Sequence, residues 1–223
     1  MADIQRTYLP AAGHDWSLPL YDPLVKLLGG DTARRILLDQ AMVRPTDRVL
    51  DIGCGTGTLA TLIKRLHTGL EVIGIDPDPK ALARARQKAA RAEVPIRFDQ
   101  GFADKLPYPD AYFDQVFSSF MFHHLQADLR EATLREVRRV LAPGGSFHML
   151  DFARPEARAA GWWARLLHSS SHLNDNSQGR ILTLMSQGGF VYSTKVRDGA
   201  IFFGRLHTAY YQASVPPLDG QPA

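Results

Sequence analysis

The sequence of 223 residues contains only one cysteine, Cys54. One cysteine cannot form a disulfide within the chain and does not provide the paired thiols of a typical zinc site. Disulfides are rare in reducing compartments. We therefore expect a cytoplasmic protein without a bound metal, and the same count excludes chemistry that needs several thiols.

Long apolar runs are also absent. No run approaches the roughly 20 apolar residues that a helix needs to cross a bilayer, and residues 1–16 lack the apolar stretch of a secretory signal. The sequence predicts neither stable membrane insertion nor export.

Neither sign of charge dominates. There are 26 Lys and Arg residues against 23 Asp and Glu residues, which gives a formal net charge of +3. This excess is too small to indicate a polyanion-binding surface, so we expect no nucleic-acid partner. The length suits one α/β domain with a full core.

Short apolar runs alternate with helix-like stretches along most of the chain. Helical periodicity is found in residues 78–93 and 128–141. Near-continuous apolar strands separated by helices predict a parallel sheet covered on both faces. The predicted strands are residues 49–52, 71–75, 95–98, 113–119 and 146–152.

The C-terminal part has a different pattern. Residues 189–196 and 200–211 are β-rich and flank the short polar stretch Arg197–Gly199. We expect an antiparallel hairpin at the sheet edge, with its turn at Arg197–Gly199, which brings the sheet to seven strands. Residues 213–223 are expected to be a flexible tail.

The stretch "DIGCGTG", residues 51–57, places three glycines between a strand and a helix. Such a loop offers bare backbone N–H groups and a helix N-terminus to a ligand. The dinucleotide fingerprint needs a glycine at its sixth position, where Thr58 stands, and a phosphate-binding P-loop needs a lysine that "GTGTLA" lacks. NAD, FAD and ATP are therefore disfavoured.

Two acidic residues indicate another kind of ligand. Asp51 lies two residues before the first glycine, where its carboxylate would repel a pyrophosphate and favour a cation. Asp76 ends the next predicted strand, where doubly wound folds place the carboxylate that binds ribose hydroxyls. Together they predict a nucleoside that carries a positive charge and no phosphate.

These features, followed by "LPYPDAYFD", "FHHL" and "EVRRVLAPGGSFHMLDF", resemble the class I S-adenosylmethionine-dependent methyltransferases. The stretches "YDPL", "LDFARPE" and "NDNSQGRILTLMSQGGF" are similar to the ubiquinone/menaquinone biosynthesis C-methyltransferases within that family. The resemblance implies a Rossmann-like doubly wound fold, S-adenosyl-L-methionine as cofactor and a small aromatic or lipophilic acceptor. C- or O-methylation of a quinone precursor is one such reaction.

The resemblance also implies which residues bind the cofactor. The loop would wrap the methionine part, Asp51 would hold its ammonium, and Asp76 would take the ribose hydroxyls. Phe102 stands where relatives carry Asp or Asn, so one hydrogen bond to adenine is replaced by a ring contact. The complete predicted set is Asp51, Gly53, Cys54, Gly55, Thr56, Gly57, Asp76, Pro77, Phe102, Ala103, Ser118 and Ser119.

In this family the acceptor site is built from an N-terminal lid and an insertion after the fifth strand. In this chain the lid would be residues 1–45, the main domain residues 46–212, and the insertion residues 153–187 within that domain. His168 and His172 are the candidate deprotonating residues. The tryptophans of the insertion could instead pack on the core. A histidine of "HHL" could have a structural or cofactor-shaping role, or it could act as a general base. The candidate acceptor-binding residues are Tyr21, His123, Trp162 and Trp163.

Other functions fit the same motifs. A non-catalytic sensor or partner protein of this fold would bind S-adenosylmethionine through the same residues. An aminopropyl transferase would need an acidic acceptor pocket, whereas residues 154–172 are basic. A homodimer is left open.

Overall fold

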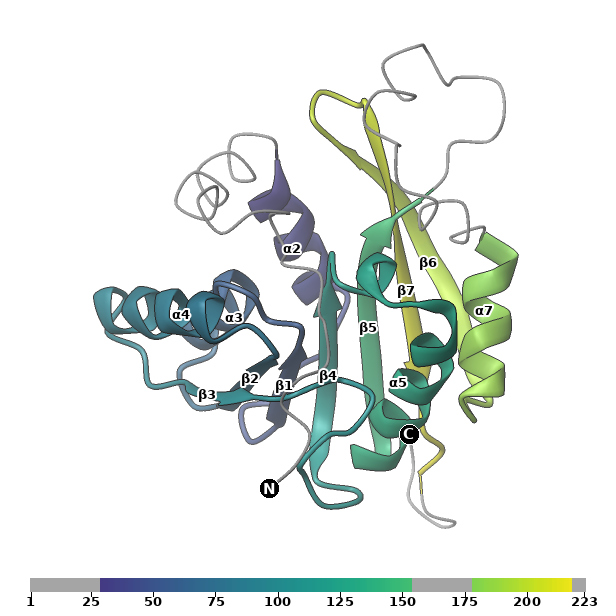
Figure 1. The fold of residues 1–223 in the computed structure, drawn as a ribbon, viewed down its shortest axis with the longest axis horizontal. Coiled ribbons are helices and arrows are strands. Elements are labelled where there is room, and N and C mark those ends of the chain that lie inside the picture. Colours follow the sequence, from purple (N-terminus) through teal and green to yellow (C-terminus); the bar gives the residue numbers. More distant parts are fainter. Residues whose placement is uncertain (1–28, 154–177, 218–223) are drawn as a thin grey trace.

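The computed structural model describes residues 29–153 and 178–217, which form a seven-stranded sheet in the order β3-β2-β1-β4-β5-β7-β6 (Figure 1). The strands from β1 to β5 are parallel, and β7 and β6 are antiparallel to their neighbours. This confirms the predicted fold class. The strands are β1 Arg48–Ile52, β2 Glu71–Asp76, β3 Arg97–Gln100, β4 Phe113–Ser119, β5 Leu141–Phe152, β6 Tyr192–Ile201 and β7 Leu206–Ser214.

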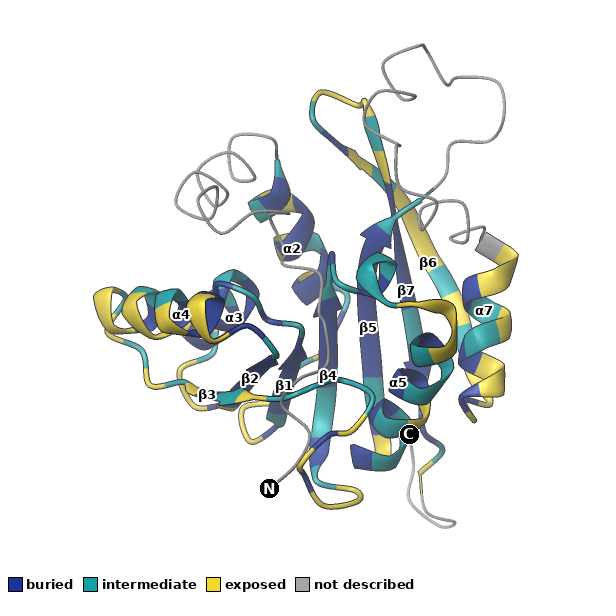
Figure 2. Cartoon of the chain, viewed as in Figure 1, coloured by how far each residue is buried: buried dark blue, intermediate teal, exposed yellow. Residues whose placement is uncertain are grey.

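Helices cover both faces of the sheet. In the described part of the chain, α2, α3 and α4 contribute apolar side chains to the core on one face, and α5 and α7 do so on the other. Figure 2 shows much of β1, β2, β4 and β5 in dark blue, whereas the outer surface of α4 and much of the edge strand β6 are yellow. The helices are α2 Gly30–Asp39, α3 Thr58–Leu66, α4 Pro79–Arg91, α5 Ala127–Val140 and α7 Gln178–Gln187, with the short 3-10 helix η2 at Phe122–His124.

Alternating strand residues supply the two halves of the core. In β1, Val49 packs with the group that includes Leu59 of α3, whereas its neighbour Leu50 packs with the group that includes Leu134 of α5. Because successive side chains of a strand point to opposite faces, a strand buried on both faces needs apolar residues at consecutive positions. This requirement explains the continuous apolar runs in the sequence.

The strand order reverses beside β1. This strand pairs with β2 on one side and with β4 on the other, so Asp51 lies between Gly74 and Phe117. In open α/β sheets, ligands bind at the carboxyl ends of the strands where the order reverses. The glycine loop starts at that place.

The C-terminal hairpin is antiparallel, as predicted, but the predicted turn at Arg197–Gly199 is wrong. Strand β6 continues through these residues, and the chain turns at residues 202–205, where Gly204 has a φ of +82°. Gly199 pairs with Thr208, and a Cβ at Gly199 would lie 2.9 Å from Tyr210 Cε2. This glycine therefore permits close packing within the hairpin instead of making the turn.

The first residues of the predicted tail, 213–223, are ordered parts of the fold. Strand β7 continues to Ser214, the Val215 N–H donates to the Gly145 carbonyl at 3.0 Å, and the Gly144 N–H donates to the Val215 carbonyl at 3.1 Å. Residues 218–223 lie outside the described part. For those residues the flexible tail stays a prediction.

Candidate functional site

The glycine loop uses its three glycines in different ways. Gly53, Gly55 and Gly57 have φ values of +61°, +52° and +71°, in the left-handed region that favours glycine. A Cβ at Gly57 would lie 2.8 Å from Ala85 Cβ of α4, whereas a Cβ at Gly55 would meet nothing within 4 Å. Gly57 thus lets α3 and α4 pack together, and Gly55 leaves its surface open to a ligand.

Asp51 is a buried carboxylate with one oxygen unused. Its side chain belongs to a residue only 1% exposed; Oδ2 accepts a hydrogen bond from the Ala60 N–H at 3.2 Å, and Oδ1 has no partner among the described residues. Burial raises the pKa of Asp51 from 3.8 to about 7, and the charge of Arg34 partly opposes this rise. A bound cation would satisfy the unpaired oxygen.

Asp76 connects the loop to the end of β2. Its Oδ2 accepts from the Gly55 N–H at 2.8 Å and its Oδ1 from the Asp78 N–H at 2.9 Å, and burial raises its pKa from 3.8 to about 6. Each carboxylate oxygen has a second lone pair. Asp76 can therefore hold the loop and still accept hydrogen bonds from two neighbouring hydroxyls.

Cys54 is unsuited to be a nucleophile. The residue is buried, and desolvation together with the nearby charges of Asp51 and Asp76 raises the pKa of its thiol well above the ordinary value. Its N–H donates to the Ile75 carbonyl at 3.0 Å, which joins the loop to β2. These contacts favour the interpretation that Cys54 is a small residue that packs beside the ligand site.

A lysine of α4 fixes the second half of the loop. Lys88 Nζ donates to Thr56 Oγ1 at 3.1 Å and to Thr58 Oγ1 at 2.6 Å. These hydrogen bonds connect the loop to the last turns of α4, so the backbone around Thr56 is preorganised in the absence of a ligand.

The end of β4 brings two predicted serines to the same region. Ser118 is fully buried, and its Oγ has no hydrogen-bond partner among the described residues. Ser119 Oγ accepts from Arg34 Nε at 3.4 Å. The next residue, Phe120, has a φ of +56°, which is unusual for a residue other than glycine and is typical of strained functional segments.

These elements enclose one pocket at the carboxyl ends of β1 and β4. Residues of the loop and Ser119, which the sequence predicted, line this pocket together with Arg34 and Phe120, which it did not. The Arg34 guanidinium lies 5.4 Å from the centroid of the Phe120 ring. The lining residues are Arg34, Gly53, Cys54, Gly55, Thr56, Thr58, Leu59, Ala81, Ser119 and Phe120.

Arg34 is a site residue that the sequence analysis missed. It lies on the buried face of α2 beside Ala33, Leu37 and Leu38 and is only 7% exposed. The sequence did hold a signal for a site residue here, namely a charged residue on the apolar face of a helix. Burial of an unpaired charge is costly, so such a residue is expected to have a partner or a ligand.

The residues predicted to contact adenine lie in the turn after β3. The Gly101 N–H donates to the Asp76 carbonyl at 3.2 Å, which brings this turn to the end of β2, and both Phe102 and Ala103 are half-buried. Pro77 accepts a hydrogen bond from Gln100 Nε2 at 3.1 Å through its carbonyl. None of these three residues lines the pocket. Cofactor binding by Pro77 and the contacts of Phe102 and Ala103 with adenine therefore stay predictions.

The predicted acceptor residues are only partly within the described structure. Tyr21, Trp162, Trp163, His168 and His172 lie outside the described residues. His123 is in η2, directly after β4, and its Nδ1 lies 2.6 Å from Asp151 Oδ1. Asp151 is the penultimate residue of β5 and was not predicted as a site residue.

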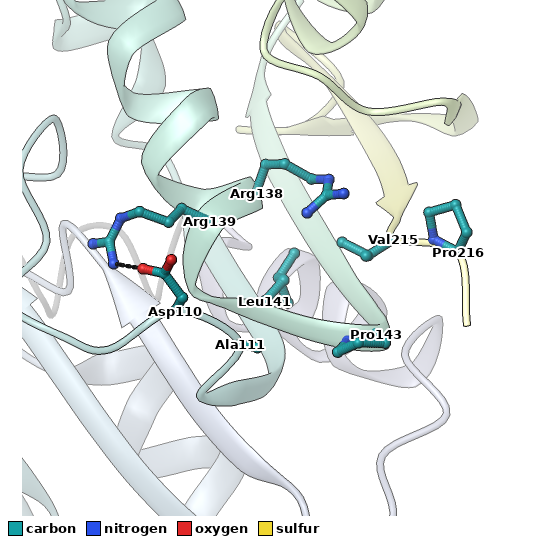
Figure 3. A pocket seen from close by; sticks show the side chains of 8 residues that line it. All are labelled: Asp110, Ala111, Arg138, Arg139, Leu141, Pro143, Val215 and Pro216. Carbon is teal, nitrogen blue, oxygen red and sulfur yellow. Dashed lines mark hydrogen bonds and ion pairs between the residues drawn. The ribbon is translucent and has the colours of Figure 1, made fainter. Parts of the chain in front are cut away.

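A second hollow lies at the opposite end of the sheet, where β4 and β5 begin (Figure 3). Arg139 is paired there with Asp110 at 2.7 Å, and Arg138 extends toward Pro216. None of the predicted site residues lines it. Ligands of doubly wound folds bind at the other end of the strands, so this hollow is not the candidate site.

Residues 29–153 and 178–217 contain neither a membrane-spanning helix nor a cluster of metal ligands. No helix there is both long enough and apolar enough to span a membrane. No three His, Cys, Asp or Glu side chains of this part are grouped as metal ligands.

Sequence comparison relates the chain to known methyltransferases. The family model described as a methyltransferase domain matches residues 49–145. A demethylmenaquinone methyltransferase of Thermus thermophilus is 42% identical over 146 residues, which cover 64% of this chain and 66% of that protein. An uncharacterized methyltransferase of Synechocystis, sll0829, is 32% identical over 157 residues, which cover 70% of each chain.

Solved structures share the fold. The YcgJ protein of Bacillus subtilis superposes with a TM-score of 0.67 at 22% identity and covers 83% of this chain and 98% of its own. Phosphoethanolamine N-methyltransferase 2 of Haemonchus contortus, crystallised with S-adenosyl-L-methionine, has a TM-score of 0.65 at 16% identity and covers 83% of this chain and 52% of its own.

The doubly wound sheet, the open glycine loop and the two carboxylates at its edge define a protein that binds a cationic nucleoside. The chain belongs to the class I S-adenosylmethionine-dependent methyltransferase family, as the sequence motifs predicted. Its matched part spans about two thirds of the length of the Thermus relative, 66%.

Proposed function

We propose that the protein transfers a methyl group from S-adenosylmethionine to a small aromatic, lipophilic acceptor of the phenol or hydroquinone class. The observation that carries the cofactor part is the pair of buried carboxylates, Asp51 and Asp76, on either side of the open loop. The acceptor class is supported by the Thermus relative, which is named for a demethylated menaquinone.

The residues present suit a cofactor with a zwitterionic amino-acid end and a ribose. The unpaired Oδ1 of Asp51 would take the ammonium, and the guanidinium of Arg34 would take the carboxylate. Asp76 would accept hydrogen bonds from the ribose hydroxyls, while Gly55 leaves room for the ligand. Opposite charges thus face the two ends of the amino-acid group.

The cofactor supplies a methyl group on a positively charged sulfur, and its leaving group is a neutral thioether that needs no acid. The contribution of the chain is alignment and the exclusion of water. The ring of Phe120 lines the pocket and packs 5.0 Å from the ring of Phe152, so apolar side chains border the site at the ends of β4 and β5.

Calorimetry and a transfer assay test the proposal together. The full chain should bind S-adenosylmethionine and its demethylated product, and it should move the methyl group to a demethylated naphthohydroquinone. Saturable cofactor binding with no transfer to any member of a panel of phenols, hydroquinones and amines would favour the non-catalytic sensor instead. No cofactor binding would contradict both functions.

Substitution of Arg34 by methionine tests the carboxylate site. We expect a loss of S-adenosylmethionine affinity of roughly 10- to 100-fold, since a charge-assisted hydrogen bond contributes about 1.5–3 kcal/mol. 5′-Methylthioadenosine is the matched ligand, because it has the nucleoside but no amino-acid end. Its affinity, measured by calorimetry, should be unchanged in Arg34→Met, and an equal loss for both ligands would show that Arg34 only supports the fold.

Cofactor affinity is expected to rise with pH. The pKa of Asp51 is raised to about 7 and that of Asp76 to about 6. A cation binds the ionised form, so binding below these values must displace a proton. Between pH 5.5 and pH 8 the affinity should increase roughly 10- to 30-fold, because the ionised fraction of a carboxyl group with a pKa near 7 increases by about this factor over the same range. Calorimetry across this range should show the full rise in the wild type and only a roughly fourfold rise in Asp51→Asn, from the ionisation of Asp76.

The same shifts predict the opposite trend for the free protein. Both pKa values are higher in the folded state than the ordinary 3.8, so the folded protein binds protons more tightly than the unfolded chain. The resulting stability is complete below about pH 4 and is lost as the pH rises through 6 and 7. Urea unfolding of the wild type and of Asp51→Asn should therefore diverge progressively as the pH rises from about 4 to about 7, with the variant more stable.

A further inference from the structure

A histidine and a carboxylate form a buried pair at the ends of β4 and β5. His123 Nδ1 and Asp151 Oδ1 are 2.6 Å apart, and the side chains are 12% and 1% exposed. Asp151 also accepts the His123 N–H at 2.7 Å through Oδ2 and the Phe152 N–H at 2.8 Å through Oδ1. The carboxylate is thus held by the backbone on both sides of the pair.

The geometry fixes which ring nitrogen is available. A carboxylate accepts hydrogen bonds, so the hydrogen of a neutral imidazole lies on Nδ1, and Nε2 carries the lone pair. Among the described residues, Nε2 has no hydrogen-bond partner. A histidine oriented in this way is arranged to accept a proton, because the carboxylate stabilises the imidazolium that forms.

The pair lies beside the cofactor pocket. Phe120 lines the pocket, and its N–H donates to the Leu150 carbonyl at 2.9 Å, one residue before Asp151. The Phe152 ring contacts the rings of both Phe120 and His123, with centroids 5.0 and 4.9 Å away. A ligand that extends from the loop toward β5 would therefore meet His123 next to two aromatic rings.

We propose that His123 removes the hydroxyl proton of the acceptor and that Asp151 positions His123 for this step. This inference rests on the proposed function. The O–H bond of the phenol or hydroquinone breaks, its electron pair stays on the acceptor, and the proton moves to Nε2. The imidazolium later returns the proton to water, so one proton is released for each methyl group transferred.

Other titratable groups surround this pair. The His124 ring lies 3.9 Å from the His123 ring. Burial, and to a smaller extent the charges of Asp151 and Asp198, raises the pKa of Tyr211 of β7 to about 12. Tyr211 therefore keeps its proton over the working range.

The experiment uses the full chain saturated with S-adenosylhomocysteine and 2-naphthol, whose anion absorbs at a longer wavelength than the neutral phenol. In the wild type the bound probe should ionise at a lower pH than the free probe. In His123→Gln this shift should disappear, while calorimetry gives the same affinity for S-adenosylhomocysteine. His207→Gln is the matched control, because His207 is exposed on β7 near the same end of the sheet.

Transfer kinetics provide the second readout. Asp151→Asn should lower kcat on the order of 100-fold, the usual contribution of general base catalysis, with the KM for S-adenosylmethionine within about threefold. A His123→Gln protein that ionises the probe like the wild type, or that keeps its kcat, would overturn the inference and leave the proposed function intact. A wild type that binds S-adenosylhomocysteine but no phenol would overturn both.

Discussion

Replacement of Asp76 by alanine is expected to lower the affinity for S-adenosylmethionine by about 100-fold or more. On the proposed assignment, the variant loses two hydrogen bonds between a carboxylate and ribose hydroxyls, each of which contributes about 1.5–3 kcal/mol. It also removes the acceptor of the Gly55 and Asp78 N–H groups, so the loop itself is less well held. Calorimetry with S-adenosylhomocysteine measures the loss directly.

Asp114→Ala separates the binding effect from a general loss of stability. Asp114 of β4 also accepts a backbone hydrogen bond, from the Arg48 N–H at 2.8 Å, but it lies at the opposite end of the sheet. We expect Asp114→Ala to be less stable than the wild type and to bind the cofactor normally. An Asp76→Ala protein with unchanged affinity would remove the ribose assignment.

The second large effect is expected at Gly57, where valine should reduce the free energy of unfolding by about 2–5 kcal/mol. The φ of +71° costs a residue with a Cβ about 1–2 kcal/mol, and more for a β-branched side chain. The new Cβ would also lie 2.8 Å from Ala85 Cβ and 3.0 Å from Phe98 Cζ, so α4 and β3 must shift, which costs about 1–3 kcal/mol. Urea unfolding followed by circular dichroism measures the change.

Gly55→Val is the matched variant in the same loop. Its φ of +52° is similar, but its Cβ would meet no atom within 4 Å. Gly55→Val should lose only the stability that corresponds to the cost of a positive φ for a residue with a Cβ. It should nevertheless bind S-adenosylmethionine at least tenfold more weakly, since the valine side chain occupies the open surface. Equal losses of stability in Gly55→Val and Gly57→Val would contradict the different roles of these glycines.

Sequence patterns predicted those parts of the fold that depend on local chemistry. The apolar runs gave the parallel strands, and 113–119 matches β4 at both ends. The hairpin turn was misplaced because Gly199 resembles a turn residue in the sequence, whereas its actual role depends on Tyr210 of the partner strand. Contacts between strands are not encoded in the residues next to the glycine.

The same distinction between local and tertiary information applies to the candidate site. Asp51, Asp76 and the glycines lie within one strand-loop-helix-strand segment, so their order along the chain was enough to predict their proximity. Arg34 and Asp151 reach the site only through tertiary packing, of α2 over β5 and of β5 beside β4. Arg34 belongs to no local motif, and the stretch "LDFARPE", which contains Asp151, served only to identify the family, so sequence reasoning assigned neither residue a role.

The outermost strands of the described sheet bear on how copies of the protein meet. Strand β3 is only four residues long and carries the exposed Arg97, while β6 carries Lys195 and Asp198, paired at 2.7 Å, and the exposed Arg197. Short strands and charged side chains at an edge disfavour pairing with another sheet. Two copies should therefore not join edge to edge into a continuous sheet, and concentrated solutions should resist β-aggregation by this route.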